Sequence, residues 1–334
     1  MPRHKRLEIP GAVYHVIARG IERRKIFLDD SDRKEFIRRF SEALKDCGCR
    51  CYGWVLMPNH FHLVVRTGAK PLSDLMRRVL TGYAIYFNRR YRRSGYLYQN
   101  RYKSILCQEE TYLLELVRYA HLNPLRAGMI KDVKSLNKYK WSGHSVIMGR
   151  NPAKWQSIGE ILGRFGNKRS VAMQKYLDFV VDGAGMGKRY DLTGGGLRRS
   201  AGGWSGVYEL KRAKESWRGD ERILGDGNFV NETLKISEEE MTKKEKLKKA
   251  GWDMDKLTTH VCELIGIKRD EIGKKGKQNK ISRAKGLIAY WGKHGLGISG
   301  RVIGNYLGST RQAVAYMAKQ GEKLVGENKY ILSF

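Results

Sequence analysis

The sequence has few acidic residues, few cysteines and no long apolar run. Its 34 Asp and Glu residues are outnumbered by 65 Lys and Arg, so the chain has a formal net charge of +31. Such a chain attracts polyanions, and nucleic acid is the first partner that this charge predicts. An acidic membrane surface is the alternative, but the sequence shows no lipidation motif, transmembrane run or secretory signal. We expect a soluble, cytoplasmic, nucleoid-associated protein with no membrane partner.

The cysteine content argues against a disulfide framework, because five cysteines are an odd number spread over 334 residues. Cys47, Cys49 and Cys51 form a C-x-C-x-C run, but this spacing differs from a zinc knuckle and no second pair follows. We expect a strand beginning with thiols on one face instead. The 41% of hydrophobic residues excludes a disordered chain, and the length allows two or three domains.

The first part of the chain alternates between strand and helix patterns. The patterns predict strands over residues 12–20, 51–57, 60–66 and 96–107. Helical spacing predicts helices over residues 32–47, 71–87 and 109–123. Ser31 and Asp32 are the expected caps of the first helix, and a tight turn is expected at Pro58 and Asn59. This order predicts an α+β fold, an antiparallel sheet with helices packed on one face.

The remaining chain divides by composition into a Gly-rich basic stretch and a helical, Lys-rich end. The G-x-G-x-G-K run at 183–188 lacks the helix that a phosphate loop requires, so a flexible connection is the favoured interpretation. Helices are expected over residues 282–295, 299–308 and 309–324, with Gly308 in a turn and Ser309 as N-cap. This is the helix-turn-helix pattern, although a plain helical bundle could share it. DNA contacts are then expected from the leading end of the last helix, at Thr310, Arg311 and Gln312.

His60 and His62 stand two positions apart in a predicted strand, so their side chains share one face. Two imidazoles on one face can converge on a metal ion. Tyr119 and Asn123 are four apart in a predicted helix and could aim a hydroxyl and an amide at the same place. A tyrosinate could attack phosphorus while a metal polarises the phosphate. Because Asn123 precedes a proline, the helix could also end there.

Other residues allow more than one interpretation. Tyr83, Tyr86 and Tyr112 are alternative nucleophiles, whereas His121 is expected to be structural because it faces away from Tyr119. The arginine run that contains Arg89 and Arg90 could be a solvated face, or a track for phosphates and bases beside neighbouring tyrosines. Arg101 and Lys103 alternate along the predicted strand 96–107. We expect them to line a DNA groove.

Three stretches together resemble a known family: MPNHFHLVV, QNRYKSIL and VRYAHLNPLRAGMI. They are similar to the HUH motif, the following strand and the tyrosine helix of single-tyrosine HUH transposases, most closely the REP-associated tyrosine transposases. The resemblance implies an RRM-like sheet that cuts single-stranded DNA near hairpins of repetitive palindromic elements. It implies a 5′-phosphotyrosine intermediate, a free 3′-hydroxyl and rejoining without ATP. It also implies Tyr119 as nucleophile and His60, His62 and Asn123 as ligands of Mg²⁺ or Mn²⁺.

The resemblance covers about residues 8–150, so the expected domains are 1–150 for transposition, 151–235 as a connecting region and 236–334 for helix-turn-helix DNA binding. The last domain is loosely similar to the DNA-binding domain of the replication initiator DnaA, with STRQAV in place of its Asp-His-Thr-Thr run. It could bind duplex DNA. A catalytically idle DNA-binding regulator and an RRM-like RNA-binding protein are the alternatives, and the protein could be a monomer or a dimer.

Overall fold

The computed structural model describes residues 6–68, 70–187, 192, 220, 222–274, 280–328, 330 and 332, with backbone alone at 238–246, 248 and 249. The chain divides into two compact units, Met1–Lys235 and Ile236–Phe334. Most of the Gly-rich stretch expected as a flexible connection, residues 188–191 and 193–204, lies outside the described residues. No helix within the described part is long and apolar enough to cross a membrane.

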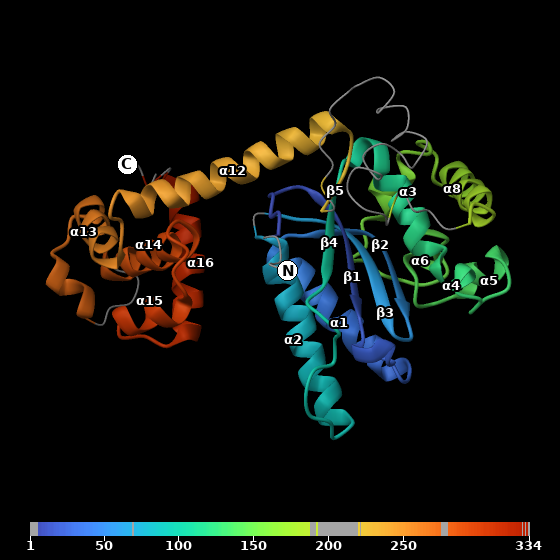
Figure 1. Cartoon of the computed structure of the whole chain (residues 1–334), viewed down its shortest axis with the longest axis horizontal. Helices are drawn as coiled ribbons and strands as arrows, with labels where there is room; N and C mark the ends of the chain where they lie inside the picture. The colour runs from blue at the N-terminus through green and yellow to red at the C-terminus, as the bar shows by residue number, and fades with distance from the viewer. Residues whose placement is uncertain are drawn as a thin grey trace. The chain divides into compact units, whose positions relative to one another are not determined.

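A five-stranded sheet forms the centre of the first unit, in the order β2-β3-β1-β4-β5 (Figure 1). Its strands are β1 (Val13–Arg19), β2 (Arg50–Met57), β3 (His60–Arg66), β4 (Lys103–Cys107) and β5 (Ile223–Leu224). The first four pair antiparallel, which confirms the predicted α+β fold. The two-residue β5 pairs with β4 in parallel, and the strand patterns of the sequence did not predict it.

Helices cover both faces of this sheet, so the prediction of helices on one face is wrong. One face packs against α1 (Asp30–Cys47) and α2 (Leu72–Arg90), the other against α3 (Glu109–His121). The physical reason lies in β2 and β3, which are apolar on both faces. Trp54 and Leu63 belong to the α1–α2 core, whereas Tyr52 and Val64 belong to the α3 core.

Short helices enlarge the core on the α3 side. They are α4 (Asn123–Arg126), α5 (Val133–Lys138), α6 (Gly143–Ile147), α7 (Ile158–Leu162) and α8 (Arg169–Ala184). Leu136, Ile147, Ile161 and Tyr176 bring four of these helices into the same cluster as α3. A turn of 3-10 helix, Ile21–Arg23, follows β1, and α12 (Gly227–Lys249) follows β5. The helix that carries Tyr119 is therefore held between the sheet and a second helical layer.

The first helix begins earlier than its predicted caps. Asp29, in extended conformation, is the N-cap and accepts a hydrogen bond from the backbone N–H of Asp32, so the prediction of Ser31 or Asp32 as cap is wrong. The Asp32 side chain is fully buried and serves a different purpose. Its carboxylate accepts hydrogen bonds from Leu28 N (2.8 Å), Arg90 Nη1 (2.7 Å) and Tyr91 Oη (2.9 Å). This carboxylate thus joins α1 to the end of α2.

Replacing Asp32 by alanine is expected to lower the free energy of unfolding of the first unit by about 3–5 kcal/mol, because several donors lose a buried charged acceptor. The exposed Asp182 at the end of α8 is a matched control, and its alanine variant should change stability by less than about 0.5 kcal/mol. Urea unfolding of the two variants measures both values. Equal stability of the two variants would show that the Asp32 network contributes little.

The predicted strand 96–107 is only partly a strand, because β4 begins at Lys103. Residues 97–99 instead lie beside the end of β1: Gln99 N donates to Arg19 O at 2.9 Å, and Ile21 N donates to Leu97 O at 3.0 Å. β1 ends at Arg19 and a 3-10 turn follows it. The residues before Lys103 therefore have no extended neighbouring strand with which to continue the ladder. Arg101 therefore lies before the strand, and the expected alternation of Arg101 with Lys103 along one strand is wrong.

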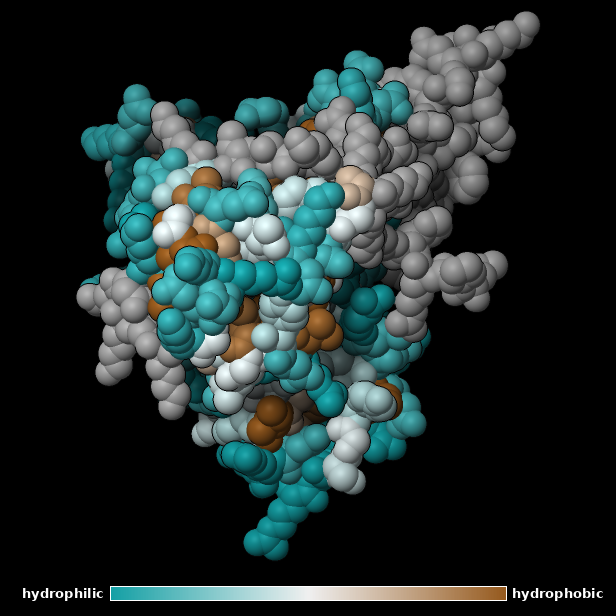
Figure 2. All heavy atoms as spheres, turned by 90° about the vertical axis from the view of Figure 1, so that its left-hand side faces the viewer, coloured by the Kyte–Doolittle hydropathy of each residue, from teal (hydrophilic) through white to brown (hydrophobic). Residues whose placement is uncertain are grey.

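The second unit consists of helices. They are α13 (Met254–Ile265), the 3-10 helix Arg269–Gly273, α14 (Lys280–His294), α15 (Gly300–Tyr306) and α16 (Arg311–Asn328). The last three match the predicted helices, but Thr310 is the N-cap of α16 in place of Ser309, because its Oγ1 accepts from Ala313 N. A Cβ on Gly304 would lie 2.5 Å from Ser309 O, so the turn between α15 and α16 requires glycine there. The face in Figure 2 is mostly hydrophilic, with small separate hydrophobic areas.

Candidate active site

The histidine pair lies on the face of the sheet that α3 covers. His60 is opposite Arg19 of β1, and His62 is opposite Ile17. Residues directly opposite each other in an antiparallel pair point to the same face. The alternation of β1 then places His15 on this face too, next to the two histidines of β3. The face thus carries three imidazoles and one guanidinium.

Tyr119 lies over this cluster. Its ring centroid is 5.9 Å from that of His62 and 5.9 Å from that of His15, edge to face in both cases. The rings of His60 and His62 are 5.2 Å apart. The structure therefore brings together the tyrosine and the two histidines that stand far apart in the sequence.

Hydrogen bonds orient both histidines. Asn59 Nδ2 donates to Arg23 O, so Asn59 Oδ1 faces His60 Nδ1 at 2.7 Å and accepts a hydrogen bond from its N–H. His60 Nε2 is then left with a lone pair. His62 Nδ1 lies 2.9 Å from His15 Nε2. When His15 accepts this bond, His62 Nε2 also presents a lone pair, which is the arrangement in which a second residue orients a metal-binding imidazole.

Both imidazoles of β3 are neutral at neutral pH. Burial, and next the charge of Arg19, lowers the pKa of His60 to about 4. Burial, followed by the neighbouring His15 and His60, lowers the pKa of His62 well below its ordinary value. Because only the neutral form of histidine binds a metal, this environment favours ligation.

Asn123, the expected third ligand, lies at a break in the helix. α3 ends at His121 and α4 begins at Asn123, two residues before the predicted end of the tyrosine helix. Asn123 Nδ2 donates to Tyr119 O at 2.8 Å, so the amide nitrogen, and not Oδ1, bonds to α3. No described contact joins Asn123 to the histidine pair. Among the described residues, no group of three or more His, Cys, Asp or Glu side chains has the spacing of a metal site.

A close approach and a buried network hold α3 in place. A Cβ on Gly53 of β2 would lie 3.3 Å from both His121 and Val117, so glycine lets the helix lie close to the sheet. Behind the helix, Tyr176 Oη of α8 lies 2.8 Å from His121 Nδ1 and 2.9 Å from His144 Nδ1. His144 Nε2 lies 2.6 Å from Asn137 Oδ1 and donates to it, so His144 Nδ1 accepts from Tyr176, which accepts from His121. His121 thus has the structural place predicted for it.

Sequence patterns missed three residues of the site: His15, Arg19 and Arg126. The Arg126 guanidinium lies 5.2 Å from the centroid of the Tyr119 ring. Burial raises the pKa of Tyr119, while Arg126 and Arg19 oppose this rise through their charge. Alternation in the first strand would have placed His15 and Arg19 on one face, but only the strand order shows that this face is the histidine face.

The predicted DNA-binding residues of the first unit lie in different places. Lys103 pairs with Ile17, so it lies on the histidine face. Arg90 forms ion pairs with Asp29 and Asp32, so its role on α2 is structural. Arg89 is exposed.

The alternative nucleophiles on α2 lie across the sheet from the histidines. Tyr83 Oη donates to Ile26 O at 2.6 Å, and Tyr86 Oη donates to Asp32 at 3.3 Å. Tyr112 lies on α3 itself and packs against the same core as Tyr119.

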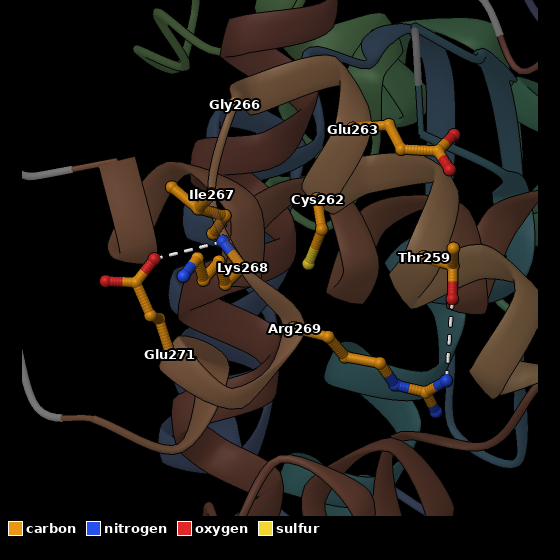
Figure 3. A pocket seen from close by; sticks show the side chains of 8 residues that line it. All are labelled: Thr259, Cys262, Glu263, Gly266, Ile267, Lys268, Arg269 and Glu271. Carbon is orange, nitrogen blue, oxygen red and sulfur yellow. Dashed lines mark hydrogen bonds between the residues drawn. The ribbon is translucent and has the colours of Figure 1, made fainter.

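The predicted DNA-binding residues of the second unit, Thr310, Arg311 and Gln312, are exposed at the start of α16. A cavity of about 560 Å³ in this unit lies between α13 and the 3-10 helix Arg269–Gly273 (Figure 3). Several of its polar groups bond within the unit, and Glu271 Oε2 accepts a hydrogen bond from Lys268 N at 3.0 Å. Arg269 pairs with Asp255 and reaches Thr259.

The part of the chain that holds this site is similar to transposases, as comparison with known protein families shows. Residues 9–123 match the sequence model of the family described as "Transposase IS200 like". The match runs from just before β1 to Asn123, so it includes both histidines of β3 and Tyr119. The chain is also similar to a solved structure described as "Structure of the REP associates tyrosine transposase bound to a REP hairpin". The two share 19% identity over 47% of this chain and 92% of the other, with a TM-score of 0.37. No curated protein matches the chain.

Proposed function

We propose that the first unit cuts and rejoins single-stranded DNA beside a hairpin, with Tyr119 as the nucleophile. The observation that supports this proposal is the Tyr119 ring over a pair of neutral histidines, 5.9 Å from His62. A binding protein has no need of a tyrosine in this place. The family match supports the transposase class, and the hairpin substrate comes from the resemblance of the three motifs.

The reaction is an in-line displacement at phosphorus. Tyr119 Oη loses its proton and forms a bond to the phosphorus, while the bond from phosphorus to the 3′ oxygen of the preceding nucleotide breaks. That oxygen takes up a proton and leaves as a free 3′-hydroxyl, and the 5′-phosphate stays on Tyr119. Attack by a 3′-hydroxyl on this linkage reverses the step and needs no ATP. Arg19 and Arg126 supply positive charge beside the developing tyrosinate.

His60 and His62 would hold a divalent ion through Nε2, with the Asn123 amide as a third ligand. Mg²⁺ or Mn²⁺, when bound, would polarise the phosphate oxygens. Two neutral imidazoles and an amide carry no net charge, so the DNA phosphate would complete such a site.

The test is a covalent trap. Labelled single-stranded hairpin DNA is incubated with the full chain and Mg²⁺ or Mn²⁺, and a protein–DNA adduct is sought on a denaturing gel. Formation of an adduct supports the proposed enzymatic activity. Binding without any adduct, across several metals and hairpins, would favour the idle regulator, and preference for RNA would favour the RNA-binding alternative.

Arg126→Ala is expected to slow adduct formation by about 10–100-fold, because the tyrosinate loses a nearby positive charge in a partly buried site. Arg126→Lys keeps a charge and should recover part of the rate. Single-turnover cleavage with saturating DNA measures both variants. A rate for Arg126→Ala equal to that of the wild type would remove this residue from the chemistry.

We also propose that the second unit binds duplex DNA through α16. Three polar side chains are exposed at the leading end of this helix, after a turn that needs Gly304. This is where a recognition helix contacts base edges.

Gln312→Ala is expected to weaken binding to a duplex selected from random sequence by about 1–3 kcal/mol, because a base contact is lost. Gln320, exposed farther along α16, is the matched control, and its alanine variant should bind as the wild type does. Fluorescence anisotropy measures the two affinities. Equal losses of duplex affinity for Gln312→Ala and Gln320→Ala would argue against base recognition by the N-terminal end of α16.

A further inference from the structure

A groove of about 980 Å³ lies in the first unit, between α2 and residues 95–102. Neither the nucleophile nor the histidine pair lines it. Its walls combine three arginines, aromatic rings and side-chain amides, and no acidic residue lines it. Because the groove is concave, basic and aromatic, we infer that it binds unpaired nucleotides of the DNA strand. This inference rests on the proposed function, since it assigns the groove to the same single-stranded substrate.

Tyr96 is the residue that this inference explains best. Its side chain is 84% exposed, an unusual state for a large aromatic residue, and it lies at the wall of the groove. Stacking of a nucleobase on an exposed aromatic ring is a common basis of single-strand binding and tolerates any base. Ile85 of α2, also on the wall, is 49% exposed and adds apolar surface.

The arginines provide charge for the phosphates. Arg101 is exposed and makes no described hydrogen bond or ion pair, so its charge is available to a phosphate. Arg77 is paired only loosely with Asp74, at 3.5 Å. Arg6 lies 3.8 Å over the ring of Tyr102 and donates to its carbonyl, which fixes one wall.

Two hydroxyl groups on the walls lack a described hydrogen-bond partner. The oxygen atoms of Tyr98 and Tyr102 are both buried and unpaired, and Tyr102 as a whole is only 7% exposed. A buried unpaired hydroxyl is unfavourable, and the large majority of such groups in proteins are satisfied. Because neither oxygen is accessible from the groove, contacts with the DNA strand would come from the exposed Tyr96 ring and the arginines.

The groove is also connected to the strand that carries Arg19. The wall segment bonds to this strand end through Gln99 N to Arg19 O and Ile21 N to Leu97 O, and Ile21 itself lines the groove. Arg19 is opposite His60, so the site of chemistry and the groove share one end of β1. This continuity favours the nucleotides that adjoin the cleaved phosphate as the occupant.

The test measures binding of a fluorescent oligothymidylate to the full chain, with Tyr96 changed in two ways. Tyr96→Ser should weaken binding about tenfold, because the stacking surface is lost, whereas Tyr96→Phe should bind within about twofold of the wild type. Arg101→Ala should also weaken binding and lower its dependence on salt by about one phosphate contact. Arg150, exposed in the same unit and away from the groove, is the control, and Arg150→Ala should leave binding unchanged.

Unchanged binding by both Tyr96→Ser and Arg101→Ala would overturn the inference. So would a wild-type dimer in sedimentation that Ile85→Glu converts to a monomer, because a second copy would then occupy the groove. The adduct assay separates this inference from the proposed chemistry. If the wild type forms no adduct but binding depends on Tyr96, the proposed cleavage by Tyr119 is wrong, whereas the assignment of the groove to unpaired nucleotides is supported. If an adduct forms on Tyr119 but neither Tyr96→Ser nor Arg101→Ala weakens binding, the groove assignment is wrong while the proposed chemistry is supported.

Discussion

Replacing Tyr119 by phenylalanine is expected to abolish covalent attachment to DNA while leaving the fold and hairpin binding intact. The change removes only the phenolic oxygen, and that oxygen makes no described hydrogen bond. The ring can keep its edge contacts with His15 and His62. The free energy of unfolding should therefore change by less than about 0.5 kcal/mol, whereas adduct formation should fall by at least about 10³-fold, because no other group supplies the nucleophile.

Tyr112→Phe is the matched control for this experiment, since Tyr112 lies on the same helix and the same core. It should form the adduct at the wild-type rate. Mass spectrometry of the digested adduct should find the nucleotide on the peptide that contains Tyr119. An adduct of wild-type yield from Tyr119→Phe would move the chemistry elsewhere, with Tyr112 as the first position to examine.

Local patterns predicted most of the elements that hold this site. The alternation in 60–66 and the short Pro58 and Asn59 turn placed two histidines on one face, and helical spacing placed Tyr119 on a helix. These features depend only on residues close in sequence. The same locality explains why the predicted caps were near the true ones, with Asp29 in place of Ser31 and Thr310 in place of Ser309.

The remainder of the site depends on contacts between distant parts of the chain. His15 joins His62 only because β1 lies next to β3, an order that no local pattern encodes. The strand β5 has two residues and meets β4 from more than a hundred positions away in sequence. The groove behind α2 exists because residues 97–102 leave the ladder where β1 ends.

Removing the metal or either histidine of β3 is expected to stop cleavage without unfolding the first unit. EDTA should abolish adduct formation, and Mg²⁺ or Mn²⁺ should restore it. His60→Ala and His62→Ala should each lower the rate by about 10²–10³-fold, since each removes a ligand from a site with few protein donors. His62→Ala should be the more destabilising of the two, because His62 is 4% exposed and bonds to His15.

Binding of Mn²⁺ provides a readout that does not depend on turnover. Electron paramagnetic resonance should show Mn²⁺ bound to Tyr119→Phe in the presence of hairpin DNA, and weakly or not at all without DNA, because the protein ligands are uncharged. The alanine variants of His60 and His62 should lose this binding, whereas His294→Ala, at an exposed position in the second unit, should keep it. Cleavage at the wild-type rate in EDTA, or by a double alanine variant of His60 and His62, would end the metal hypothesis. The reaction would then depend on Arg19 and Arg126 for its positive charge, and their alanine variants would be the ones to lose activity.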